Sequence, residues 1–265
     1  MTSKRLAPSA IQCYINFSER DVTQEIKPEI SIFFPVYNDE KTVEIVFNKA
    51  LQFLQDYASK GEIIIINDGS PDRSGEIAER LVTEYPEIAR VIHHLGNLGY
   101  GAAVRTGLRE SRYEWICFTD GDDEYDIRDF PKLLRLRQYY ELVITFRYQK
   151  LYSSKRICIS WVYNAVLRWM FRSPFRDIST GLRMINKRVA SDLDLTSCSP
   201  FIGAEITFKA MLKGFPVGEV GIQTFPAKFR NGASVRIRNI VATIRDMIKV
   251  YRCIFSPDYE LDRRR

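Results

Sequence analysis

Short apolar runs alternate with amphipathic stretches through the first half of the 265-residue chain. Runs rich in Ile, Val and Phe predict buried strands, and apolar residues that recur every three to four positions predict helices. The expected strands cover residues 30–34, 62–66, 90–93 and 114–118, and the expected helices cover residues 42–57, 74–84 and 101–112. This alternation is typical of an α/β protein with a mostly parallel sheet and helices on both faces.

Carboxylates follow three of the expected strands. PVYND ends at Asp39, NDGSPD contains Asp68, and TDGDDEYD contains Asp120 and Asp122. The carboxyl ends of parallel strands meet at one edge of a sheet, where ligands of α/β proteins bind. Carboxylates from distant parts of a chain that meet there can offer oxygens to Mg²⁺ or Mn²⁺. The pattern therefore favours a metal site for a diphosphate over a solvated acidic turn.

The segment GNLGYGAAVRTG places Gly99 and Gly101 at the start of an expected helix. It lacks the Gly-Lys-Ser/Thr of an ATP-binding loop and follows the third strand, so neither an ATPase loop nor a dinucleotide fingerprint fits it well. Two uses of the glycines stay open. They allow a tight turn with close helix packing, or they let the backbone approach a ligand.

Charge is divided unequally along the chain. Residues 1–134 hold 15 Lys and Arg against 23 Asp and Glu, whereas residues 135–265 hold 24 against 10. This asymmetry predicts different partners for the two halves. We do not expect nucleic acid as a partner, because zinc-finger, RRM and basic-zipper patterns are missing. An anionic membrane surface or a phosphate-bearing ligand fits the basic half.

Apolar runs also bear on location. No run approaches the ~18 residues of a membrane span, and the N-terminus lacks the apolar core of a signal peptide. The five cysteines are widely spaced, which favours reduced thiols. We therefore expect a protein on the cytosolic side, with structural roles for its two histidines, His93 and His94.

Two segments of the second half have amphipathic patterns. Residues 151–172 interleave aromatic and basic side chains, Trp161 and Trp169 among them, as an interfacial helix does. Residues 237–251 place apolar residues on one stripe of a helix and basic residues elsewhere. Packing against the core would give the same stripe. We favour a membrane surface for the first segment and core packing for the second.

Five motifs in order carry a resemblance to a known family. They are FFPVYND, IIIINDGSPDRS, GNLGYGAAVRTG, TDGDDE and RDISTGLRM. With them the chain resembles family 2 glycosyltransferases, especially dolichol- or polyprenyl-phosphate mannosyl- and glucosyltransferases. The resemblance implies a GT-A (Rossmann-like) catalytic domain over residues 29–235, with a sugar-nucleotide half (29–146) and an acceptor half (147–235). An N-terminal extension (1–28) and a C-terminal amphipathic helix with a basic tail (236–265) would flank it.

The resemblance implies nucleotide-sugar contacts after the first two strands. Pro35, Tyr37 and Asp39 match the family's Pro-x-Tyr-Asn-Glu segment, with Asp in place of the usual Glu. Ile66 and Asp68 match the base-binding end of the second strand, although Asn replaces the first Asp of the family's pair.

The fourth strand is followed by the implied metal site. Asp120, Gly121 and Asp122 match the family's Asp-Ala-Asp segment, and Glu124 stands where relatives often have a metal-binding Gln. The implied metal ligands are thus Asp120, Asp122 and Glu124, with Asp122 also counted as catalytic. The neighbouring acidic residues of this segment are expected to be solvated.

Further residues match the acceptor side of the family. Arg147 matches an Arg that grips phosphate near the reacting centre, and Asp177, Gly181 and Arg183 match the Asp-x-x-Ser/Thr-Gly-Phe-Arg segment. Arg147, Asp177 and Arg183 are therefore expected to be catalytic. A phosphate acceptor, with a second pKa near ~6, is mostly dianionic and needs orientation more than a base. A hydroxyl acceptor would need a base, for which Asp177 is the first candidate.

The family's C-terminal Arg-x-x-Gly-x-Ser-Lys motif is altered in this chain. KFRNGASVR keeps the Gly and Ser but has apolar residues at the Arg and Lys positions. Lys228, Arg230 and Arg236 are near enough to substitute, and Arg230 is included among the expected nucleotide-sugar contacts.

The resemblance implies an inverting, metal-dependent hexosyltransferase that uses Mg²⁺ or Mn²⁺. It would carry mannose or glucose from GDP-mannose or UDP-glucose to dolichyl or undecaprenyl phosphate. It would be peripheral at the cytosolic face of a membrane, or would use an integral-membrane partner. Two alternatives stay open. One is a family 2 transferase that extends a polysaccharide or modifies a soluble acceptor, and the other is a catalytically silent sugar-nucleotide-binding or scaffold subunit.

Overall fold

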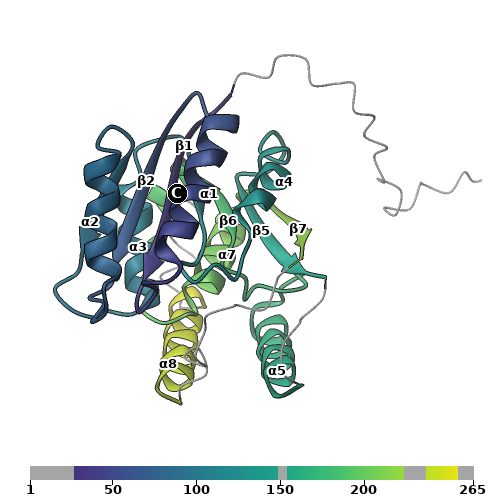
Figure 1. Ribbon diagram of the computed structural model, residues 1–265. Coiled ribbons are helices and arrows are strands. Elements are labelled where there is room, and N and C mark those ends of the chain that lie inside the picture. Colours follow the sequence, from purple (N-terminus) through teal and green to yellow (C-terminus); the bar gives the residue numbers. More distant parts are fainter. Residues whose placement is uncertain (1–26, 149–153, 224–236, 256–265) are drawn as a thin grey trace, which may run out of the picture.

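A seven-stranded sheet of order β3-β2-β1-β4-β6-β5-β7 forms the centre of the molecule (Figure 1). The computed structural model describes residues 27–148, 154–223 and 237–255. The strands are β1 (Glu29–Val36), β2 (Lys60–Asn67), β3 (Ala89–His93), β4 (Trp115–Phe118), β5 (Leu142–Arg147), β6 (Arg183–Asn186) and β7 (Val217–Ile222). Only β6 runs antiparallel to its neighbours, β4 and β5, within this sheet. The expected mostly parallel α/β fold is therefore confirmed.

Helices cover both faces of the sheet. They are α1 (Val43–Tyr57), α2 (Ser74–Glu84), α3 (Tyr100–Glu110), η1 (Ile127–Asp129), α4 (Phe130–Leu134), α5 (Ser154–Phe171), α6 (Lys187–Asp192), α7 (Ile202–Leu212) and α8 (Ile237–Ile254). Alternate residues of β1 enter two separate apolar clusters. Ile32 and Phe34 pack with α1 and α4, whereas Phe33 packs with α3 and α7. Because successive side chains of a strand point to opposite faces, β1 anchors both layers.

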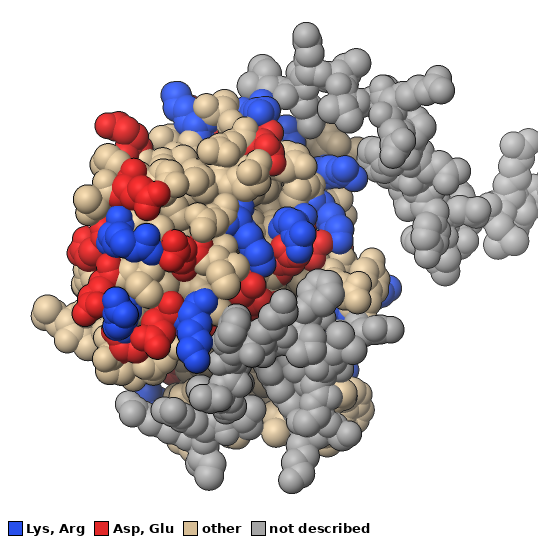
Figure 2. Space-filling view, in the orientation of Figure 1, with Lys and Arg blue, Asp and Glu red and all other residues tan. Residues whose placement is uncertain are grey.

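Helices α1 and α2 form a face on which both charge signs mix (Figure 2). Arg80 of α2, for example, contacts Glu44 of α1 at 2.7 Å. Both side chains are about half exposed, and such exposed pairs contribute little to stability. The acidic excess of the first half is therefore not a continuous negative surface on this face.

Helices α5 and α8 lie beyond the carboxyl ends of the strands, at the bottom of Figure 1. α8 packs on the core through Val250 and Ile254, which are 1% and 3% exposed. Its apolar stripe is exposed instead: Val241 and Ile244 are 60% and 46% accessible. Core packing was therefore the wrong expectation for these two residues, whereas Tyr251 of the same stripe packs against Phe171 of the core. Within the described residues, no helix combines the length and hydropathy needed to cross a bilayer.

Candidate active site

Asp120 lies after β4, between two elements that come from distant parts of the chain. The hydroxyl of Tyr100, the first residue of α3, donates to Asp120 Oδ1 at 2.7 Å. On the other side Gly181 packs so closely that a Cβ there would lie 2.5 Å from Asp120 Oδ2. Two of the expected site residues, Asp120 and Gly181, are thus in direct contact, and a side chain at position 181 would displace the carboxylate.

The loop after β1 lies against Gly121, next to Asp120. A Cβ at Gly121 would lie 2.5 Å from the carbonyl oxygen of Pro35 and 3.3 Å from Asp39 Oδ2. Asp39 Oδ2 also accepts from the amide of Tyr37 at 2.9 Å. In addition, Thr42 Oγ1 donates to the carbonyl oxygen of Gly121 at 2.7 Å. The loops after β1 and β4 therefore meet, as the sequence predicted.

Asp68 holds a loop. Its Oδ1 lies 2.7 Å from His94 Nδ1 and accepts from the amide of Leu98 at 2.9 Å. Its Oδ2 accepts from the amide of Gly99 at 3.0 Å. Asp68 is only 3% exposed, so its carboxylate organises residues 94–99. The role expected for His94 is structural, and these contacts agree with it.

Ile66, the other residue expected at the base-binding end of β2, is fully buried. Its side chain belongs to the apolar cluster that includes Phe33 and Phe118. The expected nucleotide contact at Ile66 stays a prediction, in which the side chain takes no part because it lies inside the core.

The acidic residues after Asp120 have different surroundings. The Asp122 side chain accepts from the amide of Glu124 at 3.1 Å, and Glu124 itself is only 2% exposed. Asp123 contacts Lys49 at 2.6 Å, and Asp126 contacts Arg128 at 2.7 Å. Asp123 and Asp126, expected to be solvated, therefore each have a basic partner.

The described residues contain no group of three His, Cys, Asp or Glu side chains arranged to hold a metal ion. The expected triad of Asp120, Asp122 and Glu124 is thus not assembled; Glu124 is buried, and the other two are partly exposed. Mg²⁺ commonly takes one or two carboxylates and fills its other positions with water and substrate phosphates. Asp120 and Asp122, hard oxygen donors at a strand end, fit that mode.

Arg147, at the end of β5, forms a buried pair with Asp177. Arg147 Nη2 lies 2.8 Å from Asp177 Oδ2, and the two side chains are 5% and 4% exposed. The same nitrogen donates to Ser179 Oγ at 2.6 Å. Asp177 Oδ1 in turn accepts from Asn164 of α5 at 3.1 Å and from Ser179 Oγ at 2.6 Å. Asp177 thus connects Arg147, α5 and the loop before β6.

Arg183 is 1% exposed and donates only to protein groups among the contacts described. Its nitrogens reach the carbonyl oxygens of Ile178, Thr180 and Gly203, and its Nη1 reaches Thr207 Oγ1 at 2.8 Å. This geometry fixes the loop before β6 against α7. It fits a positioning role rather than the catalytic contact that the resemblance implied, because the guanidinium is enclosed by main-chain acceptors.

Sequence reasoning missed Tyr100. Burial, together with the neighbouring Asp120 carboxylate, raises the pKa of this phenol well above its usual value. Tyr100 therefore stays protonated and donates to Asp120. An aromatic residue between two glycines at a helix start was the available clue.

Gly99 and Gly101 serve close packing. Gly99 has a φ of 97°, which favours glycine. A Cβ at Gly99 would lie 2.5 Å from the carbonyl oxygen of Cys198, and one at Gly101 would lie 2.6 Å from that of Ser197. The sequence left open whether these glycines allow close packing or the approach of a ligand, and these contacts support close packing. The expected basic contacts Lys228, Arg230 and Arg236 lie outside the described residues.

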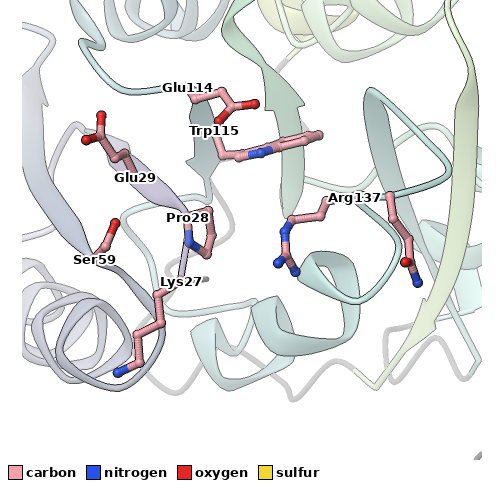
Figure 3. Close-up of a pocket in the computed structure, with 8 residues that line it drawn as sticks. Lys27, Pro28, Glu29, Ser59, Glu114, Trp115 and Arg137 are labelled. Carbon is pink, nitrogen blue, oxygen red and sulfur yellow. The ribbon is translucent and has the colours of Figure 1, made fainter. Parts of the chain in front are cut away.

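A cavity of about 520 Å³ lies elsewhere (Figure 3). Its lining residues are Lys27, Pro28, Glu29, Ser59, Glu114, Trp115, Arg137 and Gln138. Several of these residues stand at or just before the first residues of β1, β2 and β4. The cavity is therefore at the amino edge of the sheet, opposite the carboxylates, and we do not place the donor site there.

Residues 31–191 match the family described as glycosyl transferase family 2. The chain belongs to glycosyl transferase family 2. The segment runs from the third residue of β1 past the end of β6 and contains Asp120 and its neighbours. The family that the resemblance named is thus confirmed.

Curated relatives of this family 2 glycosyltransferase include the uncharacterized glycosyltransferase EpsJ of Bacillus subtilis, 41% identical over 118 residues. That match covers 44% of this chain and 33% of EpsJ, so the chain spans about a third of that relative's length. The dolichol-phosphate mannosyltransferase of Pyrococcus furiosus is 25% identical over 250 residues, or 89% of this chain and 66% of that protein.

Solved structures with the same fold include glucosyl-3-phosphoglycerate synthase from Mycobacterium tuberculosis, in complex with Mn²⁺, UDP and phosphoglyceric acid. Its TM-score is 0.65 at 16% identity, and the match covers 84% of this chain and 78% of that one. This likeness confirms the GT-A fold expected for the family 2 glycosyltransferase.

Proposed function

We propose that this family 2 glycosyltransferase transfers mannose or glucose from a nucleoside diphosphate sugar to a polyprenyl phosphate, with inversion, at the cytosolic face of a membrane. One observation carries the proposal. Helices α5 and α8 lie at the edge of the sheet where β1 and β4 end (Figure 1). The carboxylates follow these strands, and both helices expose apolar side chains. A charged donor and a lipid acceptor would meet at such an edge.

The donor would bind at Asp39, Asp120, Gly121 and Asp122. Asp120 and Asp122 would hold Mg²⁺ or Mn²⁺, which neutralises charge on the leaving diphosphate when bound. Tyr100 donates to Asp120 and so orients its carboxylate. The bare backbone at Gly121 keeps the loops after β1 and β4 in contact and leaves no side chain between them.

The acceptor phosphate would bind near Arg147. Arginine grips phosphate through paired donors, and a phosphate that is already dianionic needs orientation more than a base. Asp177 holds the Arg147 side chain, so we assign it a positioning role in this reaction. The human dolichyl-phosphate beta-glucosyltransferase, 33% identical over 111 residues, and the polyprenol monophosphomannose synthase of Mycolicibacterium smegmatis, 24% identical over 204 residues, support this acceptor class.

Exposed apolar residues of α5 and α8 supply the lipid contact in this proposal. Trp161 and Trp169 of α5 are 64% and 83% exposed, and Val241 and Ile248 of α8 are 60% and 42% exposed. Basic residues, such as the exposed Arg168, stand beside them. Aromatic and basic side chains together favour the interface of an anionic membrane.

A transfer assay tests this function. The protein is incubated with radiolabelled GDP-mannose or UDP-glucose, polyprenyl phosphate in vesicles, and Mg²⁺ or Mn²⁺, and lipid is then extracted into organic solvent. We expect label in the organic phase that requires the metal. Label found only on a water-soluble acceptor would support the soluble-acceptor or polysaccharide alternative. Absence of both transfer and donor hydrolysis would support a silent binding subunit.

Vesicle flotation tests the membrane contact. The double variant Trp161→Ala, Trp169→Ala should bind anionic vesicles at least ~10-fold more weakly, because two large exposed aromatic side chains are lost. The matched control is Tyr139→Ala, which removes an exposed aromatic residue, 57% accessible, from the loop before β5. Equal binding by the tryptophan variant and the control would exclude α5 as the docking surface.

A further inference from the structure

Residues 196–199 form a loop between α6 and α7 whose four successive amides all donate to two carboxylates. Glu205 of α7 accepts from the amides of Thr196 at 3.0 Å and Ser197 at 2.8 Å. Asp246 of α8 accepts from those of Cys198 at 3.0 Å and Ser199 at 2.9 Å, both on its Oδ2 atom. Glu205 and Asp246 are 0% and 6% exposed. The conformation of the loop therefore depends on α7 and α8 together.

The opposite side of this loop touches the start of α3. The amide of Gly101 donates to the carbonyl oxygen of Cys198 at 2.9 Å. A Cβ at Gly101 would lie within 2.8 Å of the carbonyl oxygens of both Ser197 and Ser199. This contact is between main-chain atoms, so we expect a shift of the loop to move residues 99–101 as well.

Residues 99–101 in turn hold two carboxylates at the carboxyl edge of the sheet, of which Asp120 belongs to the proposed donor site. The amide of Gly99 donates to Asp68 Oδ2 at 3.0 Å, and the hydroxyl of Tyr100 donates to Asp120 Oδ1 at 2.7 Å. A continuous series of contacts thus runs from Asp246 through Cys198 and Gly101 to the strand ends.

We infer that Asp246 is a positioning residue for donor binding, acting through residues 196–199 on Gly99, Tyr100 and Asp120. The inference rests on the proposed function, since it requires that the donor binds at Asp120. Hydrogen bonds to a carboxylate are stronger than those between neutral groups, so a single charged acceptor holds two adjacent amides in place. α8 has separate apolar anchors in Val250 and Ile254, which a change at position 246 leaves intact.

Steady-state kinetics of Asp246→Ala and Asp246→Asn test the inference. We expect Asp246→Ala, which removes the acceptor of both amides, to raise the KM for the sugar nucleotide about tenfold, with kcat within about twofold. Asp246→Asn keeps an acceptor oxygen without the charge and should lie between wild type and Asp246→Ala. A purely structural role would instead lower the active fraction, and hence kcat, with KM unchanged. If Asp246→Ala does not fold, Asp246→Asn alone carries the test.

The matched control is Asp192→Asn on α6, which makes the same chemical change at a carboxylate that pairs with Lys213. It should leave the donor KM unchanged. A wild-type protein that neither binds nor turns over the sugar nucleotide overturns the proposed function, and this inference with it. If both Asp246 variants have the same donor KM as the wild type, the inference is wrong, while the proposed function stands.

Gly101→Ala tests the same contact from the other side. The added methyl group meets main-chain atoms of residues 197–199, which cannot rotate away as a side chain can. We expect a raised donor KM here as well. An unchanged KM in Gly101→Ala would contradict a coupling that runs through this contact.

Discussion

The donor and acceptor sides of the site use charged residues differently. Asp39, Asp120 and Asp122 follow strands and stay partly exposed. On the acceptor side, Asp177 and Arg183 are 3% and 1% exposed. Asp177 accepts from the amide of Ser179, and Arg183 donates to the carbonyl oxygen of Ile178. The exposed carboxylates at the strand ends can meet a ligand directly, whereas Asp177 and Arg183 shape the loops around Arg147, which is itself paired with Asp177. Motif matching alone assigns both kinds the same role.

The largest expected effect comes from Arg183→Met, which tests the acceptor side of this contrast. The change removes a buried guanidinium that donates to four acceptors, of which, among the contacts described, only the carbonyl oxygen of Gly203 keeps a side-chain donor, Thr207 Oγ1. We therefore expect the free energy of unfolding to fall by about 4 kcal/mol. Urea unfolding measures it. Arg188→Met, at an exposed arginine paired with Glu141, is the control and should lose less than about 1 kcal/mol. If Arg183→Met is as stable as the wild type but no longer transfers the sugar, Arg183 has a direct catalytic role.

Asp122→Asn tests the donor side. We expect transfer to fall at least ~100-fold, because the substitution removes a charged oxygen from the proposed metal site, while the unfolding transition stays near that of wild type. The assay is label transfer into the organic phase. The control is Asp123→Asn, the same change one residue on, at a carboxylate that pairs with Lys49. Equal turnover in wild type and Asp122→Asn would remove the metal assignment.

Tyr100→Phe should have a smaller effect on the same carboxylate. Loss of its hydroxyl frees Asp120 Oδ1 from one hydrogen bond, and we expect about tenfold slower transfer with little change in stability. Tyr139→Phe, at an exposed tyrosine, serves as the control. Similar rates for the two variants would mean that Tyr100 does not orient Asp120.

The smallest effect concerns the pH dependence of stability. Burial alone would raise the pKa of Glu205, but hydrogen bonds from Lys209 and Ser197 outweigh it and lower that pKa below its usual value. Ionised Glu205 therefore stabilises the fold above its unfolded pKa, and this contribution is lost as pH falls through the folded pKa. We expect the stability difference between wild type and Glu205→Gln to shrink in acid. Glu87→Gln, at an exposed glutamate, should show no such trend in urea unfolding.

Local sequence patterns predicted the elements of the first half well. The expected helix over residues 74–84 has the same bounds as α2, and the four expected strands lie within β1 to β4 apart from Glu114, one residue before β4. Periodicity reports which face of an element is apolar, and that is enough to predict its type. It does not report which strands pair, so the antiparallel insertion of β6 between β4 and β5 was not predicted.

The same limit applies to the site. The motifs predicted that the loops carrying Asp39 and Asp120 meet at one edge, and the contact between Gly121 and Asp39 agrees. They did not predict that Ile66 is enclosed in the core or that Tyr100 bonds to Asp120. Burial and hydrogen-bond partners depend on elements that arrive from elsewhere in the chain, so no local pattern contains them.

By itself the sequence determined the order of strands and helices, the family and the acidic strand ends, because apolar periodicity and short motifs are local properties. Only the tertiary structure decided which charges remain partly exposed. Asp122 stays at the surface, whereas Arg183 is enclosed by α7 and the loop before β6. The physical reason is that the cost of burying a charge is met only by partners that folding brings together.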